Sequence, residues 1–348
     1  MNRARVDAAV GSVAGLVLAA GKGTRMRSSV PKVLHTVAGR PMLEWTLRCL
    51  DQVGVSNICL VLSEDRNGFA PFLARWPGLS IAVQRNRQGT GDAVAAAAWS
   101  FAGVQPPEFA AGYALQGQPI ECSYVLIMAG DVPAVEATAI GAFIAATQAS
   151  AAPMAVLGMH QADPTGYGRM RTNGEELLDI TEEKDADTAT RRLSLCNTGI
   201  LLVDKGLLFG VLPALKPHNA QGEYYLTDCV QLARAQGRRV LAHVQADSEQ
   251  FAGINDRTQL AAVEALMIRR KRLALMVSGV ALQLPESIYV EPTVEIGADT
   301  LVAAGCHLSG ATRVGEHCFI GAGSVLKNIV IRSGEHVPPH TVRIQAEA

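Results

Sequence analysis

The sequence predicts an α/β protein in which a Rossmann-like, doubly wound and mostly parallel sheet is followed by a short left-handed parallel β-helix. Two observations predict this fold. From Gly15 to about Asp256, short apolar runs alternate with segments that have the apolar spacing of helices. From Val290 onward, aliphatic residues recur at every sixth position instead. The change of period divides the chain into two structural regions.

In the first region, the spacing of apolar residues distinguishes strands from helices. Apolar runs predict strands over 16–20, 57–63, 79–84, 123–131 and 153–159. Helical spacing predicts helices over 41–53, 91–101 and 137–150. In a sheet of this kind, ligands bind at the carboxyl ends of the strands. Gly21 and Asp131 both stand at the end of a predicted strand, which places them at that edge of the sheet.

The second region has the six-residue period of a parallel β-helix. The repeating aliphatic residues are Val290, Ile296, Val302, Leu308, Val314, Ile320 and Leu326, and the step then shortens to give Ile331 and Val337. The residues four positions further along are mostly small, as tight corners require. With three faces to a turn, the chain makes about three coils, in which each aliphatic residue stacks inward on its equivalent in the next coil.

Four segments follow from these patterns. Residues 1–12 are expected to be a flexible extension, 13–258 the sheet domain, 259–280 a linker helix and 281–348 the β-helix. Within the sheet domain, 105–121 has no clear period and contains Pro and Gly, so we expect a surface loop there.

Composition excludes several classes of partner. The 348 residues have a formal net charge of −1 and are only 5% aromatic, which argues against nucleic acid or a membrane surface as a partner. The seven cysteines are an odd number and form no C-x-x-C pair, so neither a disulfide framework nor a zinc site is expected. A reducing cytoplasm fits this cysteine usage best.

The stretch LVLAAGKGTRMRSSVPK, from Leu16 to Lys32, carries the strongest functional signal. Gly21 and Gly23 let the backbone turn sharply and expose N–H groups at close range. Arg25 and Lys32 place two positive charges beside this loop. N–H groups and cations together suit a polyphosphate. The spacing matches neither a dinucleotide fingerprint nor a Walker loop.

Two oxygen-bearing side chains are candidates for a magnesium site. Asp131 ends an apolar strand in MAGDVP, and Asn255 lies in GINDR. Mg²⁺ takes one or two carboxylate or carbonyl ligands and completes its octahedron with phosphate oxygens. A turn residue that caps the next element is a common alternative role for Asp131, and an ordinary loop residue is the default interpretation of Asn255 taken alone.

The string G-x-G-T-R-M-x(4)-P-K resembles the signature of sugar-nucleotide pyrophosphorylases, which are nucleotidyltransferases that join a nucleoside triphosphate to a sugar 1-phosphate. Further motifs follow in order: QRNRQGTGDA, GDVP, DPTGYGR, ITEEKDA, LCNTGI, NAQGEYYLTD and GINDR. Together they resemble the uridylyltransferase half of the bifunctional enzymes that make UDP-N-acetylglucosamine. The resemblance covers about 15–265. It implies a Mg²⁺-dependent transfer of the uridylyl group of UTP to N-acetylglucosamine 1-phosphate, with release of pyrophosphate.

The resemblance also implies roles for individual residues. Arg25, Lys32 and Asp131 are the expected catalytic residues, and Asp131 and Asn255 the expected Mg²⁺ ligands. The nucleotide is expected to contact Leu18, Ala19, Ala20, Gly21, Gly23, Gln84, Gly89, Thr90 and Gly130, with Gln84, Gly89 and Thr90 at the uracil. The sugar is expected to contact Gly168, Glu182, Asn197, Tyr225 and Thr227. The attacking phosphate is already ionised, so the reaction needs positioning and charge neutralisation rather than a general base.

The sequence departs from the family at two places. The family's β-helix is longer and carries an acetyltransferase site, which has no matching motif here, so we expect no acetyl transfer and predict that the short coil stack assembles a homotrimer. Ala129 stands where the family has a tyrosine beside the sugar, so the identity of the sugar remains open. The alternatives are therefore the same reaction with another sugar 1-phosphate or nucleotide, or a non-catalytic sugar-nucleotide-binding scaffold. A hexapeptide acyltransferase lacks its site residues.

Overall fold

The computed structural model describes residues 13–110, 115–116 and 119–346, and the expected N-terminal extension, 1–12, lies outside them. The chain divides into two compact units. The first contains the chain up to His35 and Met42–Asn255, and the second contains Thr36–Pro41 and the chain from Asp256 onward. The helix expected as a linker therefore groups with the second unit, as does a hairpin at Thr36–Pro41.

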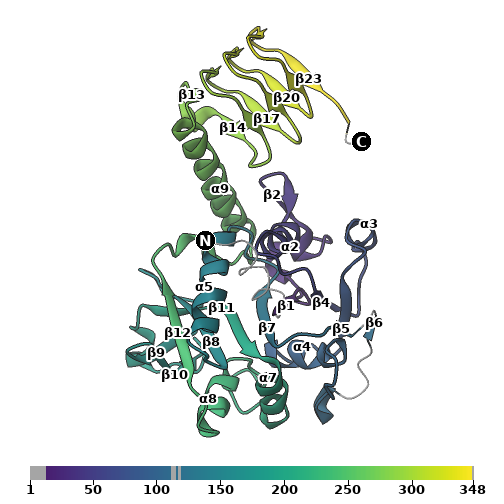
Figure 1. The fold of residues 1–348 in the computed structure, drawn as a ribbon, viewed down its shortest axis with the longest axis vertical. Coiled ribbons are helices and arrows are strands. Elements are labelled where there is room, and N and C mark those ends of the chain that lie inside the picture. Colours follow the sequence, from purple (N-terminus) through teal and green to yellow (C-terminus); the bar gives the residue numbers. More distant parts are fainter. Residues whose placement is uncertain (1–12, 111–114, 117–118, 347–348) are drawn as a thin grey trace. The chain divides into compact units, whose positions relative to one another are not determined.

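The first unit is built on a ten-stranded sheet flanked by helices (Figure 1). Its strands are β1 (Val13–Leu18), β4 (Ile58–Ser63), β5 (Ser80–Gln84), β6 (Leu115–Gln116), β7 (Tyr124–Ala129), β8 (Met154–His160), β9 (Arg169–Asn173), β10 (Glu176–Thr181), β11 (Leu195–Asp204) and β12 (Val240–Gln245). Its helices are α2 (Met42–Gln52), α3 (Ala70–Ala74), α4 (Thr90–Ala96), α5 (Ala137–Ala149), α6 (Thr188–Arg191), α7 (Lys205–Val211) and α8 (Asp228–Ala235). The strand order is β6-β5-β4-β1-β7-β11-β8-β12-β10-β9.

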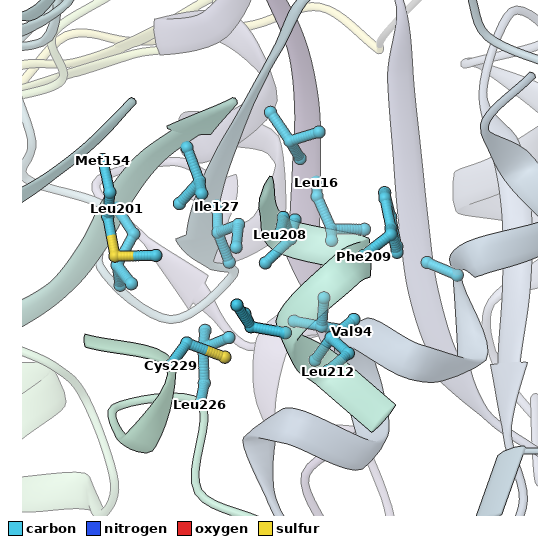
Figure 2. Packing of buried hydrophobic residues seen from close by; sticks show 14 of the residues in the cluster. Leu16, Val94, Ile127, Met154, Leu201, Leu208, Phe209, Leu212, Leu226 and Cys229 are labelled. Carbon is cyan, nitrogen blue, oxygen red and sulfur yellow. The ribbon is translucent and has the colours of Figure 1, made fainter. Parts of the chain in front are cut away.

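The part of the sheet that carries the candidate site is parallel, as predicted. β1 lies between β4 and β7 and runs parallel to both, and β5 extends the parallel set beyond β4. Strands β1, β4 and β7 are nearly continuous apolar runs because helices cover both faces of the sheet. On one face, Leu16 and Ile127 pack with residues of α4, α7 and α8 (Figure 2). Strand β11 is antiparallel to all three strands with which it pairs, β7, β8 and β9.

The predicted helices occur with small changes in their bounds. The segment expected as a helix over 91–101 is α4 followed by a 3-10 turn, Ala98–Ser100, so the regular helix ends earlier than its alanine-rich composition indicates. Within 105–121, the described residues include a 3-10 turn, Glu108–Ala110, and edge strand β6. The remainder of that predicted loop, 111–114 and 117–118, lies outside the described residues.

The second unit begins with helix α9 (Arg257–Val277), whose first turn is capped by Asp256, the side chain of which accepts a hydrogen bond of 2.9 Å from the Gln259 N–H. The inserted hairpin consists of β2 (Thr36–Val37) and β3 (Arg40–Pro41). The coil strands are β13 (Ala281–Leu282), β14 (Tyr289–Val290), β15 (Glu295–Ile296), β16 (Leu301–Val302), β17 (His307–Ser309), β18 (Arg313–Val314), β19 (Phe319–Ile320), β20 (Val325–Lys327), β21 (Val330–Ile331), β22 (His336–Val337) and β23 (Val342–Ile344).

These coil strands form the predicted left-handed β-helix. They pair in parallel into three sheets, β13-β16-β19-β22, β14-β17-β20-β23 and β15-β18-β21, and Figure 1 shows one of these faces stacked strand on strand. Val290, Leu308 and Leu326 are in register and fully buried, as the six-residue period predicts. Small residues close the corners: Thr312 Oγ1 donates to Ser309 O at 2.7 Å, and Ser324 Oγ donates to Gly321 O at 2.7 Å.

Among the residues that the structure describes, no helix has both the length and the apolar character needed to cross a membrane.

Candidate active site

A cavity of about 470 Å³ opens in the first unit where the parallel strands end. It lies at the carboxyl ends of β1, β5 and β7, which is where a sheet of this topology binds ligands. Its lining residues are Leu18, Ala19, Ala20, Gly21, Lys22, Lys32, Val33, Gln84, Arg87, Gly89, Thr90, Ala93, Ala129, Asp131 and Glu223. Three of its charged side chains are cationic, so the cavity suits an anionic ligand.

The glycine loop follows β1 and folds back onto Lys32. Gly23 has a left-handed backbone, with φ at +58°, and a Cβ added to it would lie 2.5 Å from the Cβ of Lys32. Glycine is required here for both conformation and space. The loop continues into a 3-10 turn, Thr24–Met26, in which Met26 is buried and Arg25 is exposed. The burial of Met26 and the close approach of Gly23 to Lys32 thus hold the loop against Lys32.

The Lys32 ammonium joins the two residues predicted to bind metal. It forms an ion pair with the Asp131 carboxylate and donates a hydrogen bond of 3.1 Å to Asn255 Oδ1. Asp131 also fixes the backbone near Asn255, because its carbonyl accepts a hydrogen bond of 3.0 Å from the Ile254 N–H. Within the described ranges there is no cluster of three or more His, Cys, Asp or Glu side chains arranged for a metal ion. A site here would therefore rely on one carboxylate, one amide oxygen and the oxygens of a ligand.

On the opposite side of the cavity, Gln84 and the loop that follows it are fixed by a buried carboxylate. Asp92, in the first turn of α4, is fully buried. Its Oδ2 accepts a hydrogen bond of 2.8 Å from Gln84 Nε2 and one of 3.0 Å from the Gln88 N–H. Gln84 Nε2 also donates to the Gly89 carbonyl at 3.0 Å. The side chain at the end of β5 is thus held in one position.

Residues 88–91 are joined to residues 224–226 by backbone hydrogen bonds. The Tyr224 N–H donates to Gln88 O and the Gly91 N–H donates to Tyr224 O, each at 2.7 Å. Thr90 Oγ1 accepts a further hydrogen bond of 3.0 Å from the Leu226 N–H. At Gly89, φ is +107° and a Cβ would lie 2.5 Å from Tyr224 O, so only glycine allows this approach.

Four of the five residues predicted to bind the sugar lie together, and none of the five is among the residues that line this cavity. Thr227 Oγ1 donates a hydrogen bond of 2.9 Å to Glu182, and a Cβ on Gly168 would lie 3.3 Å from Glu182 Oε2. The Asn197 N–H donates to Gly168 O at 2.8 Å. Burial raises the pKa of the Glu182 carboxyl, against the opposing effect of the Thr227 hydrogen bond. Tyr225 is buried and accepts a hydrogen bond from Gln221 Nε2 at 2.9 Å.

The structure places the other predicted residues as follows. Those that line the cavity are Leu18, Ala19, Ala20, Gly21, Lys32, Gln84, Gly89, Thr90 and Asp131. Those outside the lining are Gly23, Arg25, Gly130 and Asn255, of which Asn255 contacts Lys32. Sequence reasoning missed the lining cations Lys22 and Arg87 and the acid Glu223, although all three lie inside the quoted motifs GKGTRM, QRNRQGTGDA and NAQGEYYLTD. Their positions inside these motifs were the signal that could have identified them as site residues.

The fold and the cavity define a nucleotidyltransferase domain, and family models agree. Residues 15–196 match the MobA-like NTP transferase domain, and residues 293–328 match the bacterial transferase hexapeptide model of six repeats. A crystal structure from Bacillus anthracis, assigned as a glucose-1-phosphate thymidylyltransferase, shares the fold with a TM-score of 0.53 and 19% identity, over 73% of this chain and 94% of that one.

Curated relatives identify the family more closely. The chain is 38% identical to the bifunctional protein GlmU of Geobacter sulfurreducens, over 91% of this chain and 63% of that protein. It is 36% identical to GlmU of Geotalea uraniireducens, over 96% of this chain and 70% of that protein. It is 37% identical to GlmU of Thermus thermophilus, over 94% of this chain and 68% of that protein. The chain belongs to the GlmU family, and it spans about two thirds of the length of these relatives.

Proposed function

We propose that this chain transfers the uridylyl group of UTP to N-acetylglucosamine 1-phosphate, giving UDP-N-acetylglucosamine and pyrophosphate. The observation that carries this proposal is the Lys32 ammonium, which lines the cavity beside the glycine loop and bridges Asp131 and Asn255. Membership of the GlmU family supports the same reaction.

The chemistry is an in-line displacement. A phosphate oxygen of the sugar 1-phosphate forms a bond to the α-phosphorus of UTP, while the bond from that phosphorus to the oxygen bridging to the β-phosphate breaks and pyrophosphate leaves. The nucleophile is an anion at neutral pH, so no proton has to be removed. The barrier comes from bringing two anions together, and Lys32 and Lys22 lower it by placing positive charge at the cavity wall.

The residues present fit a divalent cation. The Asp131 carboxylate and the Asn255 amide oxygen already converge on one positive group, the Lys32 ammonium, and Mg²⁺ prefers such oxygen donors together with phosphate oxygens. Asp131 and Asn255 would hold the ion, and a bound Mg²⁺ would supply positive charge to the phosphate groups. Lys32 orients Asp131, and it remains a cation for the phosphates. Arg25, which is exposed on the loop, is proposed as a further phosphate contact.

The sugar is assigned to the cluster around Glu182. A partly buried carboxylate that accepts a hydrogen bond from Thr227 can also accept hydrogen bonds from sugar hydroxyl groups, and the backbone of Gly168 lies beside it. Asn197 and Tyr225 complete the proposed sugar contacts. Uracil is assigned to Gln84, Gly89 and Thr90, at the end of β5.

The test is a pyrophosphate-release assay on the purified full chain, with a panel of nucleoside triphosphates and sugar 1-phosphates. We expect UTP with N-acetylglucosamine 1-phosphate to give the highest kcat/KM, EDTA to stop the reaction and excess Mg²⁺ to restore it. Pyrophosphate release from another pair at a higher kcat/KM would transfer the assignment to that sugar or nucleotide. Nucleotide binding without any turnover would favour a scaffold.

For the second unit, we propose assembly rather than acetyl transfer. The histidines of the coils are exposed on the β-helix surface, and His307 and His336 stack on Tyr289 and Phe319 with ring centroids 4.4 and 4.6 Å apart. The coils also expose aliphatic side chains at Val330, Val342 and Ile344, which a trimer would cover. Light scattering after size exclusion is expected to give three times the mass of the chain, and a monomer would refute the assembly. Acetyl transfer from acetyl-CoA to glucosamine 1-phosphate would refute the second part.

A further inference from the structure

Asp92 stands out as a buried acid that the proposed reaction does not use. It is fully buried at the start of α4, and it lies in the motif QRNRQGTGDA, where sequence reasoning assigned it no role. A buried carboxylate costs free energy unless its oxygens accept hydrogen bonds. One of its oxygens accepts two, from Gln84 Nε2 and from the Gln88 N–H. Both donors belong to the segment that ends β5 at the cavity, so Asp92 acts on that segment.

The bonds to Gln84 determine which end of its amide points where. Nε2 lies 2.8 Å from the Asp92 carboxylate and 3.0 Å from the Gly89 carbonyl. A carboxylate and a carbonyl both accept hydrogen bonds and cannot donate them, so only the NH₂ end of the amide can face them. The other end, Oε1, is left as the polar atom that Gln84 offers to the cavity it lines. Exchanging the two ends would place three oxygens together, and Asp92 supplies one of them.

We propose that Asp92 is a specificity-positioning residue, which presents Gln84 Oε1 to the base and thereby selects uracil over cytosine. The inference rests on the proposed function, in which Gln84 meets the uracil. Uracil carries a hydrogen on N3 and can donate it to Oε1. Cytosine has a lone pair on N3 instead, which would face the amide oxygen without a hydrogen between them. Asp92 acts through Gln84 and does not itself touch the nucleotide.

A purely structural role for Asp92 predicts a different outcome. If Asp92 only stabilises α4 and the 84–92 segment, its loss weakens UTP and CTP binding equally. If it sets the amide orientation, its loss changes the ratio of the two affinities. The ratio of the UTP and CTP affinities therefore distinguishes the two roles. It does so even if the substitution also lowers the stability of the protein, because lower stability weakens both affinities equally.

The experiment measures the Kd of UTP and of CTP by calorimetry, and kcat/KM for both, on the full chain. Asp92→Ala removes the acceptor and Asp92→Ser replaces it with a hydroxyl that both donates and accepts, so in both variants Gln84 can turn. We expect the preference for UTP over CTP to fall about tenfold in each. Asp92→Asn keeps an oxygen that can accept both hydrogen bonds, so its preference should stay within about twofold of the wild type. Should Asp92→Ala not fold, Asp92→Ser decides.

The matched control is Val94→Ala, which removes buried apolar atoms from the same helix and leaves the Asp92 carboxylate in place, and its preference should not change. An unchanged UTP-to-CTP ratio in both Asp92→Ala and Asp92→Ser would overturn the inference. The proposed function is judged separately by turnover of the wild type: absent pyrophosphate release refutes that function, whereas the ratio of Kd values still tests Asp92.

Discussion

Replacing Asp131 by asparagine tests the centre of the proposed site. The substitution keeps the volume of the side chain and removes the charge that pairs with Lys32. The two side chains are 19% and 12% exposed, so the pair lies between an exposed pair, worth up to about 1 kcal/mol, and a fully buried one, whose loss costs about 3–5 kcal/mol. We therefore expect the free energy of unfolding to fall by about 1–3 kcal/mol, which corresponds to a melting temperature lower by about 2–10 °C.

The expected effect of this substitution on activity is larger. Loss of one preorganised electrostatic group at a reacting centre lowers the rate by about 10²–10³-fold. Pyrophosphate release at 25 °C and a thermal melt of the same preparation separate the two effects. The control is Glu176→Gln, which breaks the ion pair of 2.6 Å with Arg234 and should leave turnover unchanged. Turnover of Asp131→Asn within about fivefold of the wild type would refute the electrostatic role of Asp131.

Three further predictions follow from the packing and the charges. Gly89→Ala should destabilise the fold by about 2–3 kcal/mol and weaken UTP binding, because its Cβ would meet Tyr224 O. Gly237→Ala, where φ is also positive, at +71°, but the Cβ would meet open space, should cost less and leave UTP binding intact; equal effects of the two substitutions in calorimetry and melting would contradict this. Leu308→Ala should destabilise the second unit by about 2–5 kcal/mol without changing the Kd of UTP, and a change in that Kd would show that the nucleotide site depends on the coils. Burial raises the pKa of Glu182 above its ordinary value of 4.5, so the stability contributed by its protonated form is present at low pH and is lost as pH rises through the raised pKa. The melting temperature of Glu182→Gln, relative to that of the wild type, should therefore rise as pH rises above 4.5, and a fall in this difference would contradict the reasoning.

The parts of the fold that could be predicted are those with a strong local period. The apolar runs at 16–20 and 123–131 predict the central strands β1 and β7. A strand that is covered on both faces is apolar along its whole length, so its sequence is easily recognised. The six-residue repeat gives the β-helix for the same reason, since each coil repeats the local pattern of the last. The hairpin β9–β10 could not be read in this way, because its strands carry Arg171 and Asp179 and lie toward the edge of the sheet.

The site could be predicted only in part, because its contacts are distant in sequence. Lys32 lies 99 residues from Asp131 and 223 from Asn255, and no pattern in the sequence shows that one ammonium joins them. Motifs indicated that the three belong to one site but not how they are bonded. Asp92 lies in the quoted motif QRNRQGTGDA but was given no role, because a motif does not show which side chains bond to one another. Its hydrogen bonds to Gln84 and Gln88, eight and four residues earlier, are seen only in the structure.

The hairpin at Thr36–Pro41 means that no single cut yields both units whole. The peptide N–H of Ala38 donates a hydrogen bond of 2.9 Å to Glu264 on α9, and Gly39 lies against the Glu291 carboxylate. A fragment that ends at residue 255 would contain the 36–41 hairpin without its partners Glu264 and Glu291. A fragment that starts at residue 256 would contain Glu264 without the Ala38 N–H. Fragment studies of either half should therefore graft a short turn in place of 36–41, or supply that segment as a separate peptide.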